Sequence, residues 1–101
     1  MITTTAKPPN YTVIFTSILK DDPKGYPEEA DTIFELAQIQ PGYLGMESAR
    51  NELGISVSYC QSLKAIKDWG QNTRHQIAKE RGKSEFYAAF KTRICKVEMD
   101  Y

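Results

Sequence analysis

The stretch YTVIFTSILK, residues 11–20, decides the fold, because it is rich in the β-branched and aromatic residues that favour a pleated strand. Successive side chains of a strand point to opposite faces. One face carries Tyr11, Val13, Phe15, Ser17 and Leu19, and the other carries Thr12, Ile14, Thr16 and Ile18. Both faces are largely apolar, so we predict a strand that is covered on both sides.

A helix and a hairpin are predicted to follow this strand. Pro27 suits the first turn of a helix, where its missing N–H costs nothing. An apolar stripe at helical spacing comes next, formed by Ala30, Ile33, Phe34 and Ala37. Pro41 and Gly42 end the helix. Residues 43–50 and 55–61 are then predicted to be strands, and the short connection between them indicates an antiparallel hairpin.

The second half of the chain predicts two short helices and a long strand. Ser62 can cap a helix whose apolar face holds Leu63, Ile66 and Trp69. Gly70 interrupts this pattern, so a second helix is predicted to run through His75 and to stop at Gly82 in a left-handed cap. Residues 86–97 are predicted to be the last strand, with Phe90 on one face and Tyr87 and Arg93 on the other.

This order of elements predicts an α+β domain of ferredoxin-like βαββαβ plan, with one four-stranded antiparallel sheet and its helices on one face. The other face stays bare, although the first and last strands are apolar on both sides. A large bare apolar face indicates an interaction surface, and twofold dimers are the commonest oligomers. We therefore predict a homodimer, with a pocket between sheet and helices or between the two sheets.

Length and composition limit the classes of function. The 101 residues suit one domain, for which we predict a flexible N-terminal leader at residues 1–10 and a folded part at residues 11–101. Lys plus Arg equal Asp plus Glu at 13 each, so no basic surplus favours nucleic acid. The sequence has neither a secretory signal nor the ~20 apolar residues of a membrane span, so a cytoplasmic protein is expected. Cys60 and Cys95 are predicted to be free thiols, because another strand separates their strands.

Four segments in a fixed order carry a family resemblance: YTVIFTSI at residues 11–18, PGYLGMESAR at 41–50, GISVSYCQSLKAIKDW at 54–69 and HQIAKERGKSEFYAAFKTRICKVEMDY at 75–101. Together they cover nearly everything from Tyr11 onward. In these segments the chain resembles the uncharacterised bacterial branch of the antibiotic biosynthesis monooxygenase superfamily. The resemblance implies a dimeric α+β barrel. It also implies a function among cofactor-independent oxygenases of quinol-like aromatics, haem-degrading enzymes and proteins without a known substrate.

The haem-degrading members of that superfamily use an asparagine on the first strand with a tryptophan and a histidine in the last helical region. Trp69 matches the tryptophan. The first-strand position falls at Thr16 or Ser17, and the relatives' histidine lies nearer to Lys79 than to His75. Two of the three positions depart from the pattern, so the resemblance implies haem as a cofactor only as a third hypothesis.

Seven residues are candidate site residues. His75, the only histidine, is the candidate catalytic base, since imidazole titrates near neutral pH; the alternative is a surface or capping histidine. Six others are candidates for substrate binding, with core or interface packing as the alternative: the rings of Trp69, Phe15, Tyr59 and Tyr87, and the polar anchors Ser17 and Arg93. No metal-ligand spacing and no glycine-rich phosphate loop is present in the sequence, so no metal or nucleotide cofactor is predicted.

Three functions remain open. The first is a cofactor-independent monooxygenase that acts on a small aromatic or quinol-like metabolite in a pocket of a homodimeric barrel. The second is a non-catalytic ligand-binding or stress-response module of the same fold, which would hold a small apolar or aromatic molecule. The third is haem binding or degradation, in which His75 would ligate the iron.

Overall fold

The computed structural model describes residues 2–101, and its centre is the strand β1 (Asn10–Leu19). β1 pairs antiparallel with β3 (Gly54–Cys60) on one side and with β4 (Tyr87–Val97) on the other. β2 (Tyr43–Arg50) pairs antiparallel with β3, so the strand order is β2-β3-β1-β4. The predicted ferredoxin-like βαββαβ fold with one four-stranded antiparallel sheet is confirmed.

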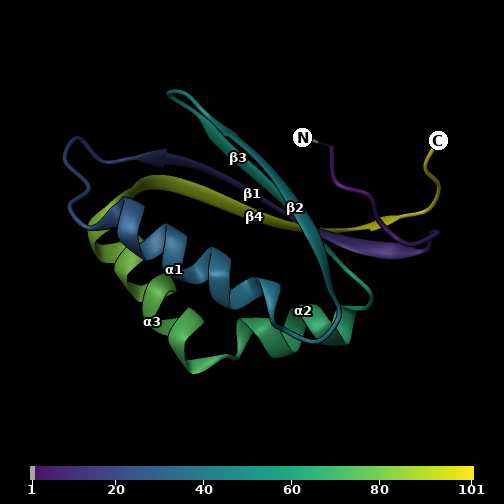
Figure 1. Ribbon diagram of the computed structural model, residues 1–101. Coiled ribbons are helices and arrows are strands. Elements are labelled where there is room, and N and C mark those ends of the chain that lie inside the picture. Colours follow the sequence, from purple (N-terminus) through teal and green to yellow (C-terminus); the bar gives the residue numbers. More distant parts are fainter. Residues whose placement is uncertain (1) are drawn as a thin grey trace.

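The helices α1 (Tyr26–Gln38), α2 (Leu63–Gly70) and α3 (Thr73–Arg81) all lie against one face of the sheet (Figure 1). Two side-chain caps fix the break between α2 and α3. The Ser62 hydroxyl accepts from the Ala65 amide at 3.0 Å, and Asn72 Oδ1 accepts from the His75 amide at 3.1 Å. His75 therefore lies in the first turn of α3. The predicted pair of short helices is confirmed.

The end of α3 differs from the prediction. Gly82 has φ −56°, which is right-handed, so it is not a left-handed cap. The chain continues instead into the π-helical turn η1 (Gly82–Phe86), and β4 begins only at Tyr87. Phe86 is 2% exposed, and its carbonyl accepts from the Lys20 amide at 2.8 Å. This anchor explains the turn, because the wider coil places the Phe86 ring in the core before the chain enters the sheet.

A β-bulge changes the faces of β4. Ile18 pairs with Ala89 but Leu19 pairs with Tyr87, so Ala88 has no partner on β1. One extra residue reverses the alternation of side chains on the bulged strand. Tyr87 consequently lies on the same face of the sheet as Phe90, and the prediction that they lie on opposite faces is wrong.

The interior holds few fully buried apolar side chains. Among residues 2–101, only Cys60 and Phe86 are fully buried hydrophobic residues, at 6% and 2% exposed. β4 is an edge strand, and its residues from Ala88 to Lys96 are all exposed. The face of the sheet away from the helices is covered in part by the segment before β1, where the Thr3 hydroxyl donates to the Met46 carbonyl at 3.0 Å.

Both cysteines are free, as predicted. Cys60 is buried on β3 and Cys95 is exposed on β4, with β1 between their strands. Burial raises the pKa of the Cys60 thiol. Within residues 2–101, no helix is both long enough and apolar enough to cross a membrane.

Candidate functional site

A cavity of about 1170 Å³ lies between the sheet and the helices. Strand alternation explains which residues border it: Val13 and Phe15 of β1, Ser58 of β3, and Thr92 and Ile94 of β4 point to the helix side. The opposite wall comes from α1, α2 and α3. Ligand pockets typically measure roughly 300–1,000 Å³, so this cavity can hold a molecule of several rings.

His75 and Trp69 form the most distinctive pair on the helix wall. Their rings stack with centroids 4.2 Å apart and planes 13° from parallel. The Nδ1 atom of His75 lies 3.1 Å from the Trp69 carbonyl oxygen. A carbonyl oxygen only accepts, so Nδ1 must carry a proton in this contact. The neutral ring then has its lone pair on Nε2, which has no hydrogen-bond partner in the described part of the chain.

The environment keeps this imidazole neutral. Burial lowers the pKa of His75 below its ordinary value of 6.5; the hydrogen bond to the Trp69 carbonyl opposes the shift, and the charge of Lys79 adds to it. A neutral imidazole with a free Nε2 is a proton acceptor at physiological pH. His75 borders the cavity, so it can accept a proton from a molecule bound there.

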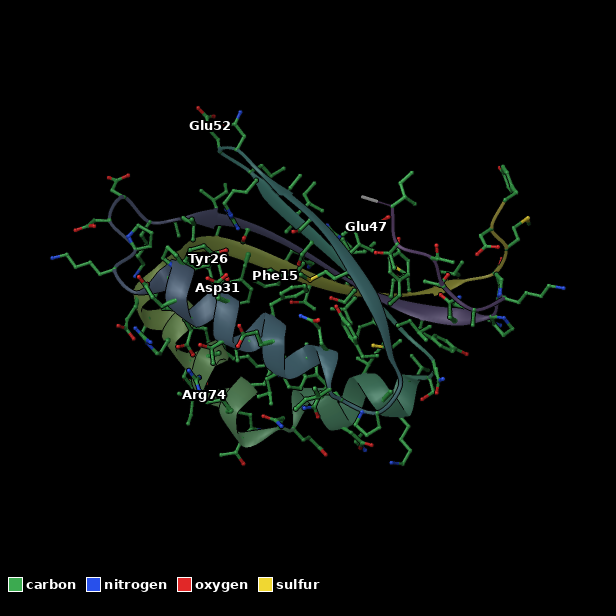
Figure 2. All side chains as sticks on the ribbon, in the orientation of Figure 1. Phe15, Tyr26, Asp31, Glu47, Glu52 and Arg74 are labelled. Atoms are coloured by element: carbon green, nitrogen blue, oxygen red, sulfur yellow. The ribbon has the colours of Figure 1, made fainter. Side chains whose placement is uncertain are left out.

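An aromatic cluster forms the end of the cavity near the start of α1. The Tyr87 ring lies 5.2 Å from that of Phe15 and 6.0 Å from those of Tyr26 and Phe90. Figure 2 shows Phe15 and Tyr26 in the space between the sheet and α1. Burial raises the pKa of Tyr87 to about 12, and the neighbouring Tyr26 adds to the rise. The cluster therefore presents flat, uncharged surfaces to whatever the cavity holds.

Arg50 enters the cavity from the sheet wall. Its guanidinium donates from Nη1 to the Ser17 carbonyl at 3.3 Å and from Nη2 to the Ser17 hydroxyl, and it lies over the Tyr26 ring at 5.7 Å. Ser17 is 1% exposed. The buried serine therefore holds a cation at the edge of an otherwise apolar surface.

Among residues 2–101, Glu29 is the only carboxylate on the cavity wall, and two arginines of α3 neutralise it. Arg74 donates to both of its oxygens, one of them at 2.8 Å, and Arg81 donates to Oε2 at 3.1 Å. The hydrogen bond from Arg74 is the main reason that the pKa of Glu29 is lowered. Glu29 is 7% exposed, so this cluster fastens α3 to α1 beside the cavity.

Four of the seven predicted site residues border the cavity: His75, Trp69, Phe15 and Tyr87. Ser17 lies just behind the wall and binds Arg50 rather than open space. Tyr59 and Arg93 belong to the other face of the sheet, since their register partners Thr12 and Ile14 alternate with the cavity-lining Val13 and Phe15. The Tyr59 hydroxyl donates there to Glu47 Oε1 at 2.7 Å, which is the main reason that its pKa is raised.

Among the cavity residues that sequence reasoning missed are Tyr26, Glu29 and Arg50. Glu29 carried a usable signal, because it stands four residues before Ile33 and so on the apolar stripe of α1. The sequence signal for Arg50 was weaker: it is the last residue of a predicted strand, and Gly54 stands opposite it in the hairpin. Within residues 2–101, no group of three or more His, Cys, Asp or Glu side chains could hold a metal ion.

Comparisons with known proteins agree with this architecture. No family profile matches the chain. It is 45% identical over 96 residues to the uncharacterized protein YqjZ of Bacillus subtilis (strain 168), an alignment that covers 93% of this chain and 84% of YqjZ.

Solved structures with low sequence identity share the fold. SnoaB of Streptomyces nogalater, a cofactor-independent oxygenase, superposes with a TM-score of 0.78 at 7% identity over 92% of this chain and 97% of its own. A Nitrosomonas europaea protein proposed to be an antibiotic biosynthesis monooxygenase gives 0.73 at 10% identity, over 93% and 94% of the two chains. Rv0793 of Mycobacterium tuberculosis gives 0.79 at 8% identity, over 91% and 97%. The chain therefore belongs to the same family as YqjZ and has the fold of the antibiotic biosynthesis monooxygenases.

Proposed function

We propose that the protein is a cofactor-independent monooxygenase of a flat aromatic, quinol-like metabolite, with His75 as the base. The observation that carries this proposal is the His75 imidazole, which borders a large apolar cavity with Nδ1 held by the Trp69 carbonyl. That contact fixes the tautomer in which Nε2 accepts a proton. The fold shared with SnoaB adds support.

The proposed reaction begins with proton transfer. His75 Nε2 takes a proton from a phenolic hydroxyl of the bound substrate, and the resulting phenolate is electron-rich enough to react with O₂. A hydroquinone and one O₂ give a hydroxyquinone and one water, so both electrons that reduce the second oxygen atom come from the substrate. The step therefore balances without an added reductant.

The cavity wall supports this chemistry by its shape and polarity. Phe15, Trp69 and Tyr87 offer ring faces against which a planar substrate can pack, and aromatic pairs of this kind stabilise by about 0.5–1.5 kcal/mol each. Substrate binding is thus assigned to these three rings, and proton transfer to His75.

We propose in addition that the active form is a homodimer, in which a second copy covers the part of the sheet face that the segment before β1 leaves open. Ile18 is 47% exposed on that face, and β4 is open along its whole edge. Exposed apolar side chains on a sheet face indicate an interaction surface. A twofold partner would cover the sheet face, and the product would be a two-sheet barrel.

The oxygenase proposal is tested by O₂ uptake with a panel of hydroquinones. We expect substrate-dependent uptake that falls at least about 100-fold in His75→Ala, the usual contribution of a general base. Gln76→Ala, an exposed neighbour on the same helix, is the matched control and should keep full activity. Uptake that never exceeds the His75→Ala level with any hydroquinone would contradict the proposal.

A second candidate is a non-catalytic module that stores or senses an apolar ligand. It is favoured by the scarcity of buried apolar side chains around so large a cavity. Native mass spectrometry of gently purified protein should then find a retained small molecule that O₂ leaves unchanged. Retention of a molecule that is consumed on exposure to O₂ supports the oxygenase instead.

A further inference from the structure

A row of three residues crosses the sheet at one end of the cavity. Arg50 of β2 pairs with Gly54 of β3, and Gly54 pairs with Ser17 of β1. Because Gly54 has no side chain, Arg50 lies across β3 and reaches Ser17 on the strand beyond. A Cβ on Gly54 would collide with the Arg50 guanidinium. The glycine therefore makes the channel in which the arginine lies.

The partners of Arg50 are all neutral. Its two hydrogen bonds go to the hydroxyl and the carbonyl of Ser17, and its third contact is the Tyr26 ring. No carboxylate lies within ion-pair distance of it in the part of the chain that the structure describes, whereas Arg74 and Arg81 both pair with Glu29. A guanidinium has five N–H donors, so Ser17 leaves donors available to an anion.

The charges around the cavity point to the same kind of ligand. The charged side chains on its wall are Glu29 and the four cations Arg50, Lys67, Lys79 and Lys83. Glu29 is already neutralised by two arginines. Lys83 lies 3.8 Å from a carboxylate oxygen of Glu80. Among residues 2–101, the wall cations without a salt bridge are therefore Arg50, Lys67 and Lys79, and they give the wall a net positive charge. An anionic ligand is the complement of such a surface.

We infer that the cavity binds a planar aromatic acid, and that Arg50 binds its carboxylate or sulfonate group. Arg50 belongs to the sheet wall and His75 to the helix wall of the same cavity. The planar fork of arginine suits such anions, and these hydrogen bonds are stronger than neutral ones. Ser17 and Gly54 are positioning residues that act through Arg50. This inference names a substrate class and rests on the proposed oxygenase only for what happens after binding.

Two fluorescent probes of the same skeleton provide the test: anilinonaphthalene sulfonate, and phenylnaphthylamine, which lacks the sulfonate. We expect Arg50→Gln to weaken binding of the sulfonate at least about tenfold, as for a charge-assisted hydrogen bond, and to leave the neutral probe unchanged. Lys24→Gln is the charge-matched control, because Lys24 is an exposed cation that does not line the cavity. Equal losses in the two variants would place the sulfonate outside the cavity and overturn the inference.

A second variant, Gly54→Ala, keeps the charge of Arg50 but displaces its guanidinium. Gly54→Ala retains Arg50 but fills the channel under its guanidinium, so it should also weaken the sulfonate probe and leave the neutral one unchanged. If wild type binds both probes equally and neither variant matters, the anion site does not exist, while the oxygenase proposal stands. O₂ uptake is measured separately with hydroquinone and with dihydroxybenzoate. If neither compound causes O₂ uptake but Arg50→Gln still weakens the sulfonate probe selectively, the oxygenase proposal is contradicted and the anion site stands.

Discussion

The Nδ1 atom of His75 lies 3.1 Å from the carbonyl oxygen of Trp69 while the two rings stack 4.2 Å apart. One residue thus fixes both the tautomer and the plane of the other. Trp69 ends α2 and His75 begins α3, so the turn between two short helices sets this geometry.

This pairing predicts a specific dependence of stability on pH. Burial lowers the pKa of His75 in the folded state, so the unfolded chain takes up the proton first as the pH falls. The contribution is complete above the ordinary pKa of 6.5 and is lost as the pH falls towards the lower folded value. Urea unfolding between pH 7 and pH 5 should show the decline.

His75→Gln should flatten that decline, because His75 is the only histidine in the sequence. Glu29 and Glu47, whose pKa values are lowered from 4.5, lose their stabilising contribution only at more acidic pH. A decline of the same slope in His75→Gln would show that another group titrates in this window.

The Glu29 cluster predicts a large difference between two adjacent carboxylates. Glu29→Gln should lower the free energy of unfolding by about 2 kcal/mol, because it weakens hydrogen bonds from two partly buried arginines. Glu28→Gln, exposed on the same helical turn, should change it by less than about 0.5 kcal/mol. Chemical denaturation measures both, and equal effects would mean that the cluster contributes nothing.

The bare sheet face predicts which isoleucine controls assembly. Ile18→Glu places a charge on that face and should shift the protein from dimer to monomer at micromolar concentration in light scattering. Ile77→Glu is the matched control, since Ile77 is 50% exposed on α3. Dissociation by the control variant alone would locate the interface on the helices instead.

Two glycines predict opposite changes in stability. Gly42 has φ +84°, and a Cβ there would lie 2.7 Å from the Ala65 Cβ, so Gly42→Ala should destabilise the fold by about 1–3 kcal/mol. Gly70 is helical and its added Cβ would meet only the end of Lys79, so Gly70→Ala should stabilise by about 0.4–1 kcal/mol. Thermal denaturation of the pair gives the signs directly.

The fold was predictable because period-two and period-3.6 patterns extend over whole elements, as in β1 and in the stripe of α1. Local events that depend on three-dimensional contacts were not. The bulge at Ala88 leaves no mark in the alternation of β4, yet it turns Tyr87 towards Phe90. No sequence pattern predicts the π-helical turn before it either, because that turn accompanies the packing of Phe86 in the core.

The candidate site was predictable where a residue's type and its element both pointed to the cavity, as for His75, Trp69 and Phe15. The polar anchor was only half predicted. Ser17 was identified as polar on an apolar strand, but its partner is Arg50 from a strand two positions away in the sheet. Such a pair depends on strand order and on the absence of a side chain at Gly54, which no local pattern reports.

The cavity has a consequence for how long the protein survives in a cell. A chain with so few buried apolar side chains gains stability from whatever fills its interior. Each tenfold rise in free ligand above its Kd adds about 1.4 kcal/mol to the free energy of unfolding. Proteases degrade the unfolded fraction, so scarcity of the metabolite would shorten the lifetime of the protein and supply would extend it. The abundance of the protein would then follow the supply of the metabolite without any change in gene expression.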